Sequence, residues 1–233
     1  MILQDLSSYF LTKNNLQNYY LNETKNLELF QKRKIPIKKS KNSNENCFII
    51  NEEDKLFWAF YIFLFGFEEF HLINNFFITE KNFKIETIQK IRDNKCLFKI
   101  NKISKNIVEN ELVNEKKINL ISLNALSLLY NLNIIFIKKR TILIFNHNKD
   151  ELINNCKNII EEKNDIISLI TLDPNIIQQL IEEYYIIENC LKPINSFSFY
   201  KFNDLVNIAK KLNLETCNKK KQKLYEEIAN YFI

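Results

Sequence analysis

The longest apolar run of the chain, LFWAFYIFLF at residues 56–65, is the feature that most constrains the fold. Asn51 and three acidic residues precede it, which favours a helix start because acids stabilise the positive end of a helix. Gly66 follows the run, so we expect a helix over residues 52–65. Ten apolar residues are too few for a membrane span, which needs about 20. A helix that is apolar on all sides is therefore expected at the centre of a folded body.

Apolar residues at helical spacing continue along much of the chain. They predict further helices over residues 4–22, 67–76, 80–95, 103–113 and 119–131. Pro174 follows Asp173, and proline favours the first turn of a helix, so another helix is expected over residues 174–190.

The pattern changes after Asn133 to runs rich in isoleucine. Residues 134–138 and 141–145 are predicted to be two strands joined by a Lys139–Arg140 turn, with a third strand at 166–171. The expected fold class is α+β, with a mostly helical body, a small antiparallel sheet and a C-terminal helix–extended–helix module.

Composition divides the chain into four expected parts: an N-terminal helical segment (1–30), a basic linker (31–47), an α+β body (48–192) and a C-terminal module (196–233). The linker sequence is QKRKIPIKKSKNSNENC. It is either a solvated loop or an arm for nuclear localisation or nucleic-acid contact.

Several kinds of chemistry are excluded by composition. The chain has a single glycine, whereas phosphate-binding loops of nucleotide-binding folds need two or three. Its two histidines, His71 and His147, are not brought together by any motif, and its five cysteines form no CxxC pair. We therefore predict no catalytic residue, no metal site and no cofactor. Isolated cysteines are typical of reduced, mostly buried thiols.

One enzymatic alternative remains open. Peptidases of the papain and OTU type place a cysteine at the start of a buried helix and a histidine on a later strand. Cys47 precedes the predicted 52–65 helix and His147 follows the strand pair, but Cys47 lies several residues too early. Within the helix, Ala59 occupies the buried position where a nucleophile would be expected, so any such fold would be catalytically decayed.

The C-terminal segment FYKFNDLVNIAKKLNLETCNKKKQKLYEEIANYFI predicts two short helices joined by a basic connector. Leu205, Ile208 and Leu212 are expected to pack against Leu224 and Ile228. The net charge of the chain is +5, and much of the excess lies here. The candidate nucleic-acid-binding residues are Lys210, Lys211, Lys219, Lys220, Lys221 and Lys223. Lysines beside a helix start can contact phosphate oxygens, which gives modest, salt-sensitive affinity.

This segment resembles the SAP family and the related Rho N-terminal-type fold. Both pack two short helices around an extended basic link. Where SAP modules usually carry glycine, this chain has Asn213 and Asn218, which tolerate left-handed backbone. The resemblance implies binding to duplex DNA.

Four longer segments, DKLFWAFYI, KIETIQKIRDNK, NLISLNALSLLYNLNIIFI and LKPINSFSFYKFNDL, are similar to an uncharacterised family from large nucleocytoplasmic DNA viruses of protists. The resemblance implies a viral origin and a place in the host cytoplasm, at the viral factory, or in the virion. Relatives often carry cysteine where this chain has Ala59.

We therefore expect a non-enzymatic viral protein that combines a protein-interaction body with a weak nucleic-acid-binding module. Its expected partners are duplex DNA and viral proteins, with no membrane; the sequence favours no particular oligomeric state. One alternative is a structural or minor virion protein without a nucleic-acid role. The other is the decayed cysteine-peptidase fold.

Overall fold

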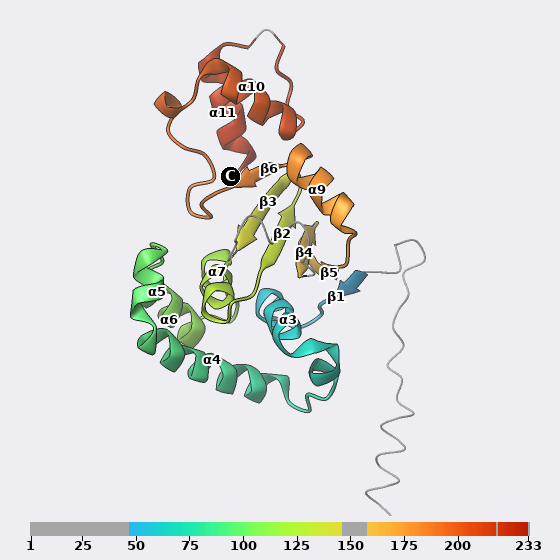
Figure 1. Cartoon of the computed structure of the whole chain (residues 1–233), viewed down its shortest axis with the longest axis vertical. Helices are drawn as coiled ribbons and strands as arrows, with labels where there is room; N and C mark the ends of the chain where they lie inside the picture. The colour runs from blue at the N-terminus through green and yellow to red at the C-terminus, as the bar shows by residue number, and fades with distance from the viewer. Residues whose placement is uncertain (1–46, 146–157, 218, 233) are drawn as a thin grey trace, which may run out of the picture. The chain divides into compact units, whose positions relative to one another are not determined.

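The computed structural model describes residues 47–145, 158–217 and 219–232 (Figure 1). They belong to a compact unit that spans residues 44–233. The predicted helix over 4–22 and the basic linker up to residue 46 lie outside the described residues. His147 and Asn218 also lie outside them.

A six-stranded mixed sheet forms the middle of this unit, with the order β1-β5-β4-β2-β3-β6. Its strands are β1 (Cys47–Ile49), β2 (Ile134–Lys138), β3 (Thr141–Phe145), β4 (Ile159–Lys163), β5 (Ile166–Ile170) and β6 (Tyr185–Ile187). The pairs β1–β5, β2–β3 and β4–β5 are antiparallel. The pairs β2–β4 and β3–β6 are parallel.

The α+β class is confirmed, but the prediction of a small antiparallel sheet is wrong. The strands β2, β3 and β5 lie where the sequence predicts them, whereas β1, β4 and β6 were missed. Strands β1 and β6 have three residues each, too few for a periodic pattern. Strand β4, IIEEK, ends in charged residues. Strand β6 follows α9 within the range predicted as one helix over 174–190, because that helix ends at Glu183.

Eight α-helices surround the sheet in the described residues. They are α3 (Lys55–His71), α4 (Phe76–Asp93), α5 (Lys95–Ile100), α6 (Lys105–Asn114), α7 (Leu120–Leu129), α9 (Pro174–Glu183), α10 (Phe202–Lys211) and α11 (Lys221–Tyr231). The helices predicted over 80–95, 103–113 and 119–131 correspond to α4, α6 and α7. The helices predicted over 52–65 and 67–76 are largely one helix, α3, with a kink at Gly66 (φ 90°, ψ 167°).

Helix α3 is the central buried helix, as predicted. Phe57, Trp58, Ala59 and Phe60 are each at most 1% exposed. The Trp58 ring packs against Phe70 and Phe76, with centroids 5.7 and 5.0 Å away. In comparable cores, truncation of such a side chain to alanine lowers the free energy of unfolding by about 3–5 kcal/mol.

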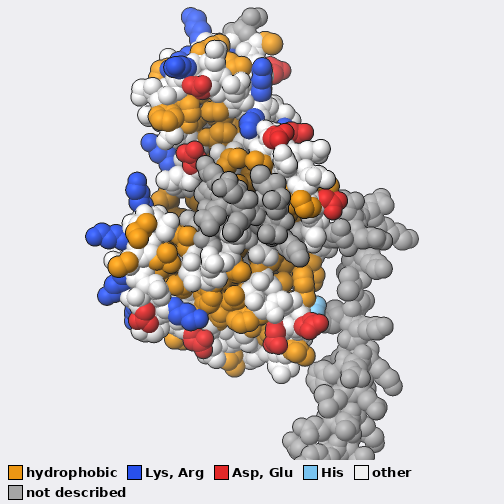
Figure 2. All heavy atoms as spheres, viewed as in Figure 1, with side chains coloured by type: hydrophobic (Ala, Val, Ile, Leu, Met, Phe, Trp, Pro, Cys, Tyr) orange, Lys and Arg blue, Asp and Glu red, His pale blue; other side chains and the backbone are white. Residues whose placement is uncertain are grey.

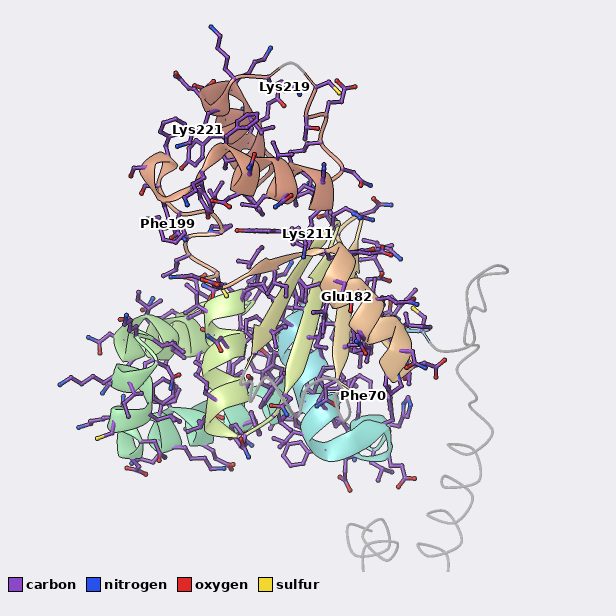
Figure 3. The ribbon with its side chains drawn as sticks, turned by 45° about the horizontal axis from the view of Figure 1, so that its top comes forward. Phe70, Glu182, Phe199, Lys211, Lys219 and Lys221 are labelled. Atoms are coloured by element: carbon purple, nitrogen blue, oxygen red, sulfur yellow. The ribbon has the colours of Figure 1, made fainter. Side chains whose placement is uncertain are left out.

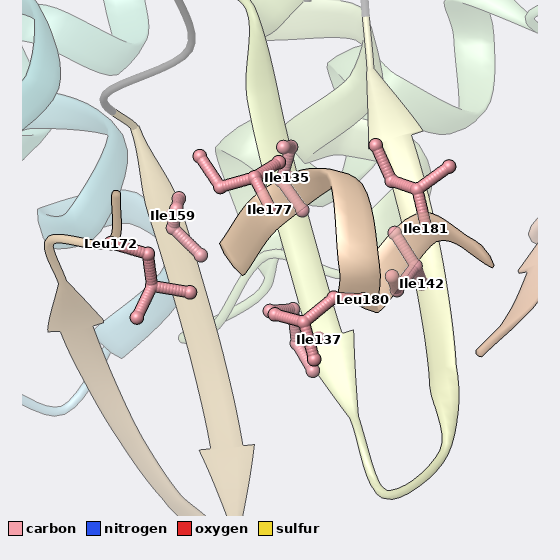
Figure 4. Close-up of a pocket in the computed structure, with 8 residues that line it drawn as sticks. All are labelled: Ile135, Ile137, Ile142, Ile159, Leu172, Ile177, Leu180 and Ile181. Atoms are coloured by element: carbon pink, nitrogen blue, oxygen red, sulfur yellow. The ribbon is translucent and has the colours of Figure 1, made fainter. Parts of the chain in front are cut away.

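The sheet buries both faces because alternate residues of a strand point to opposite sides. On β2, Ile134 and Phe136 join the main core with α3 and α7. Ile135 and Ile137 face the other way, toward α9. Figure 4 shows Ile177, Leu180 and Ile181 of α9 above these strands. All eight side chains that line this hollow are apolar, so it offers no polar group to a ligand.

A buried ion pair joins the start of α3 to α4. Asp54 and Lys84 are 1% and 2% exposed, and Lys84 Nζ lies 2.8 Å from Asp54 Oδ2. The Asp54 carboxylate also accepts the N–H groups of Phe57, at 3.3 Å, and Ile118, at 3.1 Å. Lys84 contacts Glu80 Oε1 at 2.7 Å. Asp54, rather than the predicted Asn51, therefore caps α3, and it also fixes the segment that leads into α7.

A second buried carboxylate lies nearby. Glu111 of α6 is 8% exposed. It accepts the Asn119 N–H at 2.9 Å and a hydrogen bond from the Ser122 hydroxyl. Burial raises the pKa of Glu111, and the negative charge of Asp54 raises it further, while these two hydrogen bonds lower it. Burial dominates, so ionisation of Glu111 opposes folding.

Lys84→Met removes the ammonium group and leaves the Asp54 carboxylate buried without a cation. We expect a loss of about 3–5 kcal/mol in the free energy of unfolding, measured by urea denaturation. Asp54→Asn combined with Lys84→Met should recover part of the loss, since the double variant leaves no uncompensated charge at Asp54. Lys95→Met, at an exposed position of α5, is the control. A Lys84→Met variant as stable as the wild type would contradict this role.

Glu111→Gln should change how stability depends on pH. Because the folded-state pKa of Glu111 is raised from 4.5, the wild type should lose stability as pH rises from that value through the folded-state pKa. Glutamine keeps an acceptor for Asn119 N–H and does not ionise, so the variant should lack this loss. The exposed Glu86→Gln serves as the control. A constant stability difference between wild type and Glu111→Gln across this range would contradict the assignment.

Candidate nucleic-acid interface

Helices α10 and α11 form a small core of their own. Leu205, Leu212, Leu224 and Ile228 are at most 2% exposed, and Ile208 is 9% exposed. The inward residues predicted for both helices are thus confirmed. Side chains of the other helical faces, including most of the candidate lysines, are left outside this core.

The exit from α10 has the expected left-handed residue. Asn213 has φ 56°, and the Leu214 N–H donates to the Ala209 carbonyl at 2.8 Å. This pattern closes a helix when the residue after its end adopts left-handed backbone. Lys220, the residue before α11, has extended backbone, with φ −73° and ψ 154°.

Three of the candidate lysines surround the first turn of α11. Lys220 and Lys223 are exposed, and Lys221 is half-buried. The side chain of Lys220 does not cap the N–H groups of this turn. The turn therefore presents positive charge to its surroundings.

Lys219 is engaged differently. Its Nζ lies 2.5 Å from Glu227 Oε2, and its side chain is only 16% exposed. The ion pair compensates the charge of Lys219, so this residue is less available to a phosphate than its three neighbours.

Lys210 and Lys211 do not join this group. They end α10, where a positive charge stabilises the helix terminus. The Lys211 carbonyl accepts a hydrogen bond from Arg140 Nε at 3.1 Å. Figure 3 shows Lys211 toward the sheet, on the opposite side of α10 and α11 from Lys221. The six predicted lysines thus form two separate groups.

The β2–β3 turn holds the two C-terminal helices against the sheet, which the sequence analysis missed. The Arg140 N–H donates to Tyr231 Oη at 3.2 Å, and the Arg140 guanidinium lies 4.7 Å from the Tyr184 ring centre. Lys139 Nζ lies 5.5 Å from the Tyr231 ring centre. The partners of Arg140 in α10 and α11 are 71 and 91 residues away in sequence, so no local pattern reveals these contacts.

An aromatic–basic patch, consisting of Phe197, Phe199 and Lys221, was also missed. Phe197 and Phe199 belong to a short 3-10 helix, η2 (Phe197–Phe199), and are 41% and 68% exposed. Lys221 Nζ lies 4.3 Å from the centre of the Phe197 ring. The sequence analysis interpreted the run INSFSF as a linker. Its two phenylalanines, in a polar segment beside lysines, are the pattern that could have indicated the patch.

The proposed peptidase pair is not assembled in the described residues. Cys47 is exposed on the edge strand β1, opposite Ile170. His147, the other member of the proposed pair, lies outside the described residues. Ala59 is fully buried. Cys96 and Cys217 are exposed as well, and Cys190 is half-buried, so the prediction of mostly buried thiols is wrong for the described cysteines.

No group of three or more histidine, cysteine, aspartate or glutamate side chains in residues 47–145, 158–217 and 219–232 could hold a metal ion. Within the same ranges, every helix is too short or too polar to cross a membrane.

Comparison of the chain with models of known protein families, with curated proteins and with solved structures finds no match.

Proposed function

We propose that this protein binds the phosphate backbone of duplex DNA weakly, through the first turn of α11, and uses its α+β body for contacts with other proteins. The observation that carries the proposal is the placement of Lys220, Lys221 and Lys223 around one helix start, outside a packed two-helix core. Lysines in such a place contact phosphate oxygens, which fix the position of a protein on DNA.

The same geometry supports a modest affinity with little sequence preference. Lys219 is paired with Glu227, which leaves three lysines in the group. Gln222, the amide side chain of this turn, donates to Glu226 at 3.1 Å. An amide held in this way is not free for the bidentate contact that reads adenine. Binding should thus depend mainly on charge.

Exposed apolar side chains on the body support a protein-interaction role. Phe77, Ile78 and Ile85 of α4 are 70%, 53% and 64% exposed, and Ile100 of α5 is 78% exposed. Large apolar side chains that remain exposed are available for contacts with other proteins. It equally favours the second candidate, a structural or minor virion protein without a nucleic-acid role. The setting in a viral factory or virion rests on the viral resemblance of the sequence.

Binding of the full chain to a short fluorescent DNA duplex, followed by anisotropy at several salt concentrations, tests the proposal. The wild type should bind weakly, with a log–log salt slope of about −0.9 for each phosphate contacted. Replacing Lys220, Lys221 and Lys223 together with glutamine should lower both the affinity and the slope, since the charge is lost while helix propensity is kept.

The matched control replaces Lys95, Lys99 and Lys117, which are exposed on the body, with glutamine. It removes the same formal charge and should leave the slope unchanged. If both triple variants bind alike, the lysines at α11 have no special role. If the wild type does not bind even at low salt, the virion-protein candidate replaces the proposal.

A further inference from the structure

We propose that the aromatic–basic patch binds unpaired bases of a single-stranded nucleic acid, with one base stacked on Phe199 and the adjoining phosphates near Lys221. The inference rests on the proposed function for its phosphate contacts and adds the class of nucleic acid. It thus places a single strand, rather than a duplex, as the preferred ligand of this region.

Phe199 has the exposure that stacking requires. Its side chain is 68% exposed, and it meets Tyr200 edge-on, with ring centres 5.1 Å apart and planes at 82°. An aromatic side chain this exposed is open to a flat partner. Base–aromatic stacking accepts any base because every base has a π-face.

The segment that carries Phe199 is held in place. Tyr225 Oη of α11 donates to the Asn195 carbonyl at 2.9 Å, and the Asn195 N–H donates to Tyr200 Oη at 3.0 Å. The Phe199 N–H donates to the Ser196 carbonyl at 2.9 Å. A ring on a fixed backbone loses less freedom on binding than one on a loose loop.

Positive charge beside the rings argues for a nucleic acid rather than an apolar protein partner. Lys221 lies over Phe197, and the exposed Lys201 directly follows the segment. Figure 3 shows Phe199 and Lys221 on the same side of the two helices. Figure 2 shows hydrophobic side chains beside lysines over the part of the surface formed by α10 and α11. Exposed aromatic rings next to cations are the recurring feature of single-strand binding surfaces.

The accessibility of the base faces favours single-stranded over duplex nucleic acid as the ligand of Phe199. In a duplex, each base face is covered by the neighbouring pairs, so Phe199 has no face to stack on. A single strand offers free faces and can also place its phosphates near Lys220, Lys221 and Lys223. The patch and the lysines at α11 would then act on one ligand.

The test compares full-length variants with a labelled single-stranded oligonucleotide and with the duplex of the same sequence, at equal salt. The wild type should bind the single strand more tightly. Phe199→Ala should weaken single-strand binding about tenfold, or about 1.4 kcal/mol, and leave duplex binding unchanged. The control is Phe77→Ala, because Phe77 is 70% exposed on α4, with Lys81 Nζ 5.9 Å from its ring centre.

Two further variants separate stacking from apolar contact. Phe199→Trp should keep single-strand binding, and the oligonucleotide should quench the fluorescence of the new tryptophan. Trp58 is buried, so its fluorescence supplies a constant background. Phe199→Leu keeps apolar character without a π-face and should bind like Phe199→Ala. The inference would be overturned if Phe199→Leu or Phe199→Ala bound the single strand as tightly as the wild type. If the wild type still bound the duplex in that case, the proposed function would stand. If the wild type bound neither the single strand nor the duplex, both proposals would be wrong.

Discussion

The buried Asp54 carboxylate is the interaction on which the arrangement of the helices depends. It caps α3, receives the ammonium of Lys84 from α4 and accepts the Ile118 N–H just before α7. The Asp54 carboxylate is 1% exposed. Burial of such a charge destabilises the fold unless a cation and hydrogen bonds compensate it. These contacts therefore fix the relative positions of α3, α4 and the start of α7, against which the sheet packs. The sheet in turn carries the β2–β3 turn, and Arg140 in that turn holds the C-terminal helices.

Much of the fold follows from periodicity, and the exceptions have physical reasons. The hairpin over 134–145 and the central helix could be predicted because their patterns are local and strong. Strands β1, β4 and β6 could not, since they are short or charged and gain their stability by pairing with distant strands. For the same reason the parallel pairs were missed: no local pattern specifies which strand lies beside which. Asp54 was predicted only as an acid in a first turn, because its partner Lys84 lies 30 residues away.

The candidate interface was predicted in part. The inward leucines and isoleucines of α10 and α11 were identified by spacing, and the left-handed Asn213 by its side chain. The separation of Lys210 and Lys211 from the other lysines was not, since it depends on how the two helices lie against the β2–β3 turn. Neither was the pairing of Lys219 with Glu227, nor the exposure of Phe199. Composition shows that charge is present, whereas packing decides which charges remain available.

Photo-crosslinking of the full chain to a nucleic acid, with the contact sites located by mass spectrometry, tests the central claim most directly. The claim is that nucleic acid meets the protein at the start of α11 and the segment that packs beside it. Crosslinks should map to residues 196–201 and 219–223, which are exposed or half-buried except for Tyr200. Crosslinks confined to the basic segment at 31–47 or to the body would contradict the account.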